Sequence, residues 1–231
     1  MRASLLDHPR VREFLDRNVL CAVSTGERRV ALTFDDGPSP RNTPKLLDLL
    51  AEVRARATFF LLGRYVGRYR AVADRIVREG HEVANHGHWH APLPLLPRCW
   101  KIREIEEGAR RIERATGRRP RYYRPAMGWF NQQVLDLLRD RGQRPVIGSI
   151  HPRDSRRPGA DSIVAHVMER IEPGAIVILH DGGWTPRVDR SQTLEAVSLL
   201  VPRLRERGYG FATLSELEAG GGSPRPSGTQ P

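Results

Sequence analysis

The segment from Val30 to Pro38, which reads VALTFDDGP, constrains the fold of this 231-residue chain more than any other. Its apolar first half is typical of a buried β-strand, and Gly37-Pro38 must turn the chain immediately afterwards. Two adjacent carboxylates, Asp35 and Asp36, stand at the end of this predicted strand. Bringing both into one cleft is costly unless a cation or an arginine lies between them. Taken alone, the segment is equally compatible with an ordinary Asp-Gly-Pro turn.

Strand-like and helix-like segments alternate along the chain, which predicts a parallel sheet that is either open or closed into a barrel. We expect strands at residues 30–34, 57–62, 82–84, 121–123, 145–150, 175–179 and 209–214. We expect helices at residues 43–53, 66–78, 100–116, 131–141, 161–171 and 191–207. In both forms of sheet, ligands bind at the carboxyl ends of the strands.

Polar side chains follow several of these predicted strands. They are Asp35, Asp36, His86, Arg124, His180 and Asp181. Because the carboxyl ends of parallel strands meet at one edge of a sheet, we expect these side chains to surround a common site.

A histidine-rich stretch, Asn85 to His90, follows the third predicted strand. His86 and His90 are four residues apart, so on a helical turn they would share one face. Two imidazoles and one carboxylate form a ligand set typical of catalytic zinc. An isolated pair of this spacing is more often an ordinary surface loop. The neighbouring Asp-Asp strand end instead favours a metal site made of Asp36, His86 and His90.

The net charge of +11 comes almost entirely from arginines, which are scattered along the chain. A scattered distribution disfavours a nucleic-acid-binding arm and fits an anionic substrate or surface. Charged residues interrupt the first 20 positions, which argues against a secretory signal, and no segment is apolar enough to span a bilayer. We therefore predict a cytoplasmic monomer with no nucleic-acid partner. An amphipathic helix and lead-in would occupy residues 1–27, one domain residues 28–216, and a disordered tail residues 217–231.

Several motifs occur in an order that resembles the polysaccharide deacetylase family, also called the NodB homology domain or carbohydrate esterase family 4. The resemblance covers roughly residues 28–216. Thr33 to Pro38 matches the family's first motif letter for letter, and His86 and His90 match the two histidines of the second. Arg124 to Gly128 resembles the third motif, and Leu179-His180-Asp181 matches the fifth.

The resemblance implies an α/β fold, a distorted (β/α)7 barrel, and a metal-dependent hydrolase that removes an N-acetyl group from a sugar. That sugar could be anionic or lipid-linked. The implied metal is Zn²⁺, with Co²⁺ or Ni²⁺ as alternatives, bound by Asp36, His86 and His90. For catalysis, the resemblance implies that Asp35 is the base, that Arg124 orients this base, that His180 is the general acid, and that Asp154 tunes the acid. For substrate binding, it implies that Leu179 lines an acetyl pocket and that the backbone N–H of Met127 binds the oxyanion.

Two positions depart from the family pattern. Met127 stands where the family usually has an aromatic residue. In the fourth motif, usually Asp-x-x-Asp-Trp, the chain keeps Asp154 but has Ser155 in place of tryptophan. Trp129 and Trp184 could supply aromatic stacking to the substrate instead. Two other functions stay open: an amidohydrolase acting on a non-sugar C–N bond, and an inactive barrel that binds an anionic polymer.

Overall fold

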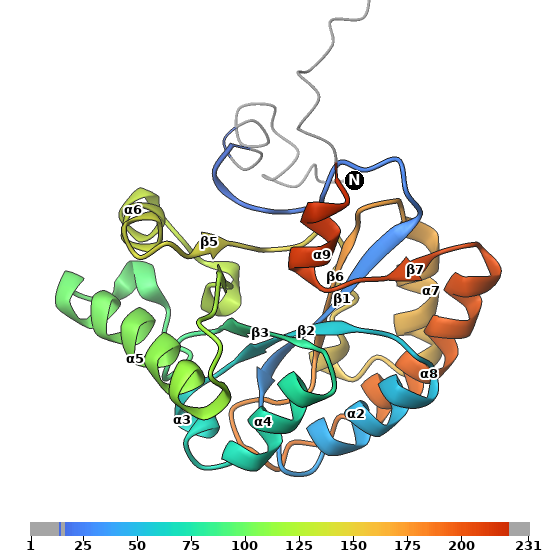
Figure 1. Ribbon diagram of the computed structural model, residues 1–231, viewed down its shortest axis with the longest axis horizontal. Helices are drawn as coiled ribbons and strands as arrows, with labels where there is room; N and C mark the ends of the chain where they lie inside the picture. The colour runs from blue at the N-terminus through green and yellow to red at the C-terminus, as the bar shows by residue number, and fades with distance from the viewer. Residues whose placement is uncertain (1–13, 15–16, 222–231) are drawn as a thin grey trace, which may run out of the picture.

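The computed structural model describes residue 14 and residues 17–221, in which a curled parallel sheet is surrounded by helices (Figure 1). The strands run in the order β5-β4-β3-β2-β1-β6, and β7 pairs separately with β1. Their bounds are β1 Arg29–Gly37, β2 Ala57–Leu61, β3 Glu82–Asn85, β4 Tyr122–Tyr123, β5 Arg144–Pro145, β6 Ile176–His180 and β7 Gly210–Phe211. Every pairing between these strands is parallel, which places their carboxyl ends at one edge.

The segment that follows β5 links the two ends of the sheet. Val146 forms a parallel bridge with Leu20, and Ile150 forms another with Val177 of β6. Only Arg144–Pro145 is a strand, so the continuous strand expected at residues 145–150 is wrong. Gly148 lies between these contacts with φ 97°, and an added Cβ would lie 3.0 Å from the Ile176 carbonyl oxygen. The bend closes the sheet, and the expected distorted (β/α)7 barrel is confirmed.

Helices cover the outside of this barrel, except for α9, which packs against the inner cluster (Figure 1). They are α2 Thr43–Glu52, α3 Gly63–Val66, α4 Arg70–Arg78, α5 Arg98–Thr116, α6 Gln132–Asp140, α7 Ala160–Arg170, α8 Ser191–Glu206 and α9 Leu214–Ala219. Short 3-10 turns occupy Leu93–Leu95, Ala126–Gly128 and Asp154–Arg156.

Two hydrophobic layers follow from the alternation of side chains along β1. Leu32 and Phe34 face outward into the main core, where they pack with buried leucines of α2 and α8. Ala31 faces inward and joins a second cluster that fills the barrel below the site. The central strand is therefore apolar on both faces, as expected for a parallel sheet buried between layers.

Two expected elements differ from the structure. The helix expected at residues 66–78 is divided into α3 and α4, which are separated by residues 67–69. The strand expected at residues 209–214 is limited to Gly210–Phe211, because Thr213 caps α9 through a capping box with Glu216.

The ordered chain continues past residue 216, where the sequence placed the end of the domain. Helix α9 runs to Ala219, and its Leu217 is buried in the inner cluster. The rest of the predicted tail, residues 222–231, lies outside the described residues, as do residues 1–13 and 15–16 of the predicted N-terminal helix. No helix in the described part of the chain is long and apolar enough to cross a membrane.

Helix α5 crosses the histidine loop, residues 86–90, at a glycine, so we expect Gly108→Ala to destabilise the protein. The new Cβ would lie 2.4 Å from Asn85 Oδ1 and 2.8 Å from the Gly87 carbonyl carbon. Overpacking of this kind lowers the free energy of unfolding by about 1–3 kcal/mol. The preference of a helix for alanine over glycine offsets roughly 1 kcal/mol of this loss. Urea denaturation would measure the difference. Gly26→Ala is the control, because its Cβ would meet nothing within 4 Å; equal midpoints for both variants would contradict the packing argument.

Candidate metal centre and catalytic cleft

The end of β1 brings two neighbouring carboxylates to the same side of the sheet. Successive side chains on a regular strand point to opposite faces. Here the register with β2 shifts between Asp35 and Gly37, and Asp36 has φ 71°. The resulting bulge turns both carboxylates toward the carboxyl edge of the barrel.

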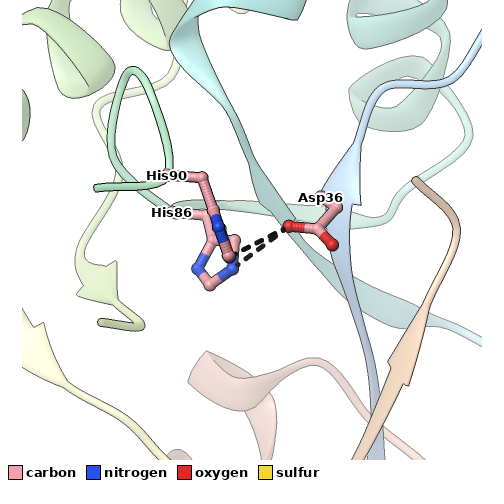
Figure 2. Close-up of side chains that lie close together, drawn as sticks. All are labelled: Asp36, His86 and His90. Carbon is pink, nitrogen blue, oxygen red and sulfur yellow. Dashed lines mark ion pairs between the residues drawn. The ribbon is translucent and has the colours of Figure 1, made fainter. Parts of the chain in front are cut away.

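Asp36, His86 and His90 form a compact cluster of ligand atoms (Figure 2). Asp36 Oδ1 lies 3.5 Å from His86 Nε2 and 3.4 Å from His90 Nε2. All three potential ligand atoms lie within 4.8 Å of one another. Asp36 Oδ1 is buried and has no hydrogen-bond partner, which is costly unless a cation satisfies it. The donor set and this oxygen fit a divalent metal ion, as the sequence predicted.

Neighbouring groups hold the two imidazoles in a form suited to metal binding. His86 Nδ1 donates to the Arg124 carbonyl oxygen at 2.7 Å, which leaves Nε2 facing Asp36 as the potential ligand atom. Burial lowers the pKa of His90 to about 4 and keeps its ring neutral. Burial alone would raise the pKa of Asp36, but its interactions with His86 outweigh burial and hold the pKa below its usual range.

The histidine loop is not a helical turn, the conformation in which the sequence would place His86 and His90 on one face. Gly87 and His90 have positive φ angles of 85° and 62°. Glu104 of α5 holds this conformation, because its Oε1 accepts the backbone N–H of Trp89 at 2.7 Å and of Ala91 at 3.2 Å. Both residues flank His90. Glu104 is 3% exposed, and a glutamate on the buried face of an amphipathic helix was the available signal in the sequence.

Asp35 is paired with Arg124 beside the metal cluster, as expected. Arg124 Nη1 lies 2.6 Å from Asp35 Oδ1 and also donates to Thr33 Oγ1 at 2.9 Å. The guanidinium group lies 4.0 Å from the centre of the Phe60 ring. Both charged side chains are buried, so this ion pair fixes the orientation of the Asp35 carboxylate and leaves Oδ2 unpaired by Arg124.

His180, at the end of β6, is coupled to Asp154. His180 Nδ1 donates to Asp154 Oδ1 at 2.7 Å, while Asp154 Oδ2 accepts from Thr193 at 2.8 Å. Burial alone would lower the pKa of His180, but the Asp154 charge and hydrogen bond outweigh it and raise the pKa to about 9. The ring is therefore protonated near neutral pH. This pairing stabilises the folded protein fully below pH 6.5, and the contribution is lost as pH rises through 9.

A cleft of about 770 Å³ joins the metal cluster, Asp35, Arg124 and His180. Among the residues expected to bind substrate, Met127 lines this cleft, whereas Leu179 and Trp129 do not. Leu179 is fully buried in the outer core. Its neighbour Ile178 lines the cleft instead, because residues two apart on a strand share a face and Ile178 is two before His180. Phe130 and Trp184 also contribute to the lining.

Two further residues near His180 differ from what the sequence suggested. His151, to which the sequence assigned no role, lines the cleft with its ring centre 6.1 Å from that of His180. Asp181 follows His180 but points away, behind β1, where it accepts a hydrogen bond from Thr43. Burial raises the pKa of Asp181 to about 7. Its position agrees with strand alternation, which places neighbours on opposite faces.

Comparison with known proteins identifies the family to which this arrangement belongs. Residues 22–146 match the family described as polysaccharide deacetylase. The chain belongs to the polysaccharide deacetylase family. It is 42% identical over 204 residues to a chitooligosaccharide deacetylase of Bradyrhizobium, covering 84% of this chain and 92% of that protein.

Two other relatives agree with this assignment to the deacetylase family. The chain is 39% identical over 197 residues to a peptidoglycan-N-acetylglucosamine deacetylase of Bacillus cereus, covering 84% of this chain and 90% of that protein. A crystal structure of a peptidoglycan N-acetylglucosamine deacetylase superposes with a TM-score of 0.84 at 27% identity, covering 89% of this chain and 95% of that one. The deacetylase fold therefore extends over nearly the whole described chain.

We expect Glu104→Ala to weaken metal binding by this deacetylase-family protein about tenfold or more, because residues that orient a ligand typically affect affinity by 10–100-fold. Competition with a chromophoric zinc chelator would measure the effect. Glu104→Gln, which keeps one carbonyl oxygen for the loop N–H groups, should lose less. Glu106→Ala is the matched control, because Glu106 has a side chain that is 56% exposed. Equal zinc affinity in all variants would exclude a role for Glu104 in holding the loop.

We expect Asp154→Asn to shift the alkaline limit of activity to lower pH. Burial lowers the pKa of His180, and the Asp154 carboxylate counteracts this effect. Without the carboxylate the pKa of His180 falls, so the ring loses its proton at a lower pH. A pH profile of kcat would show wild-type activity declining toward pH 9 and the variant declining at a lower pH. The rate near pH 8 should fall about 10²-fold, a typical contribution of a general acid. An unchanged alkaline limb would argue against His180 as the titrating group.

Proposed function

We propose that this protein is a metal-dependent N-deacetylase that acts on an N-acetylated sugar, with Zn²⁺ as its cation. The observation that carries the proposal is one cleft that brings together three potential metal ligands, a carboxylate paired with arginine, and a histidine bonded to a buried aspartate. These groups come from the ends of four different strands and converge on a single volume. Metal-assisted hydrolysis of an amide uses a Lewis acid, a general base and a general acid, which are the roles that these groups could fill.

The proposed reaction divides the work among these residues. Asp36, His86 and His90 would hold a divalent cation, which would supply a Lewis acid for activating water and polarising the acetyl carbonyl. Asp35 takes the proton of the attacking water through Oδ2, because Arg124 occupies Oδ1. His180 donates a proton from Nε2 to the leaving nitrogen, because Nδ1 is bonded to Asp154. The C–N bond breaks, and acetate and a free amine leave the cleft.

The names of the relatives support the choice of a sugar substrate. Proteins about 40% identical to this chain are described as acting on chitooligosaccharide and on peptidoglycan N-acetylglucosamine. We therefore propose a glycan containing N-acetylglucosamine. The net charge of +11 favours an acidic glycan or a surrounding anionic surface. The monomeric state, the cytoplasmic location and the absence of a nucleic-acid partner stay predictions.

Acetate release from a substrate panel tests the proposal. The panel contains chitooligosaccharides, N-acetylglucosamine, soluble peptidoglycan fragments, and nucleotide-linked and lipid-linked N-acetylsugars, each incubated with zinc-loaded protein. Release that requires zinc would support a sugar deacetylase and rank the substrates. No release from zinc-loaded protein would favour a non-sugar amide. Salt-dependent polymer binding without metal binding would favour the inactive barrel.

We expect Asp35→Asn and His86→Ala to inactivate the enzyme in different ways. Asp35→Asn should bind zinc normally yet lose at least about 10²-fold in kcat, because the general base is removed while all three ligands stay. His86→Ala should lose both zinc affinity and activity, because one ligand is gone. Zinc content measured by mass spectrometry, together with acetate release, separates the two cases. Wild-type rates in either variant would refute the assigned roles.

A further inference from the structure

We infer that Trp184 is a sugar-stacking platform at the mouth of the cleft. The inference rests on the proposed function and extends it to the way in which the glycan is held. Trp184 lies in the loop between β6 and α8, and it lines the same cleft as Ser155.

The indole of Trp184 is 74% exposed, more than that of Trp89, Trp100 or Trp129. Its ring centre lies 5.9 Å from that of the metal-site residue His90, with the planes at 75°. The exposed indole therefore stands within one sugar ring of the place where an acetamide must enter. A pyranose ring presents a face of C–H groups, and an aromatic ring offers it a large flat apolar surface.

The backbone that carries this side chain is fixed from several directions. The Trp184 carbonyl oxygen accepts from Tyr65 Oη at 2.8 Å and from Arg64 Nη2 at 3.4 Å. Two residues before Trp184, the Gly182 carbonyl oxygen accepts a hydrogen bond from Arg190 Nε at 2.8 Å. Further along, the Val188 carbonyl accepts from Asn42 Nδ2 at 2.8 Å. An anchored loop with an exposed indole reduces the entropy that sugar binding must overcome.

The same loop is packed directly against the metal-binding strand. A Cβ added at Gly182 would lie 2.0 Å from the Asp36 carbonyl oxygen, so the two backbones are in close contact. Consequently the backbone that leads to Trp184 is held at a fixed distance from the metal-binding strand. Ser155 is small and exposed, so its side of the cleft has no aromatic surface. Among the aromatic side chains that line the described cleft, Trp184 exposes the largest surface to solvent.

Binding of N-acetylchitotetraose to zinc-loaded Asp35→Asn protein, followed by calorimetry, tests the inference without turnover. Adding Trp184→Ala should raise the Kd about tenfold or more, as expected for loss of an aromatic anchor. Trp184→Phe should restore most of the affinity. Trp100→Ala is the matched control, because Trp100 is 51% exposed on α5 and does not line the cleft. Kinetics in the active background should show a raised KM with kcat little changed.

Three results would overturn the platform while leaving the deacetylase proposal intact. One is an unchanged Kd and KM in Trp184→Ala. A second is a parallel loss of zinc affinity, which would show that the indole supports His90 instead of the sugar. If Asp35→Asn does not bind the tetrasaccharide, the platform is also refuted for this glycan, and acetate release from other panel members would show separately whether the proposed function holds.

Discussion

The close approach of two carboxylates at the end of β1 is the constraint on which the rest of the site depends. Asp35 and Asp36 are both nearly inaccessible to solvent, and each needs a positive or polar partner there. Arg124 from the end of β4 serves Asp35, and the two histidines after β3 face Asp36. Only a parallel sheet curled around β1 brings these strand ends together. The barrel is therefore the means by which buried negative charge is compensated.

Much of this arrangement could be predicted from the sequence, because the signals were local. Apolar runs located the central strands, and polar residues directly after them located the site. Motif order then suggested roles for Asp35, Arg124 and His180, and those roles stay predictions. Local signals fail where a contact between distant segments decides the structure. The helical turn expected for His86 to His90 is such a case: Glu104, on a helix that begins eight residues after the loop, fixes an irregular conformation instead.

Two residues expected to bind substrate are one position away from residues that line the cleft, and this difference has another origin. Leu179 and Trp129 are each adjacent to a residue that does line the cleft, namely Ile178 and Phe130. Motif matching identifies a segment, but for Leu179 the pleat of β6 decides which neighbour faces the cleft. Applying the two-residue period from His180 would have selected Ile178. His151 lay beyond both kinds of reasoning, since its proximity to His180 depends on the bend that joins β5 to β6.

The link between Glu104 and the histidine loop ties metal occupancy to the attachment of a peripheral helix. The loop conformation includes His90 in the left-handed region, which carries an energetic cost of about 1 kcal/mol or more. That cost is offset partly by the buried contacts of α5 and partly by whatever ion the imidazoles bind. By mass action, an ion held by these imidazoles would stabilise the loop conformation and, through Glu104, the docking of α5 against it. Loss of the ion would then loosen the outer layer of the barrel at this helix.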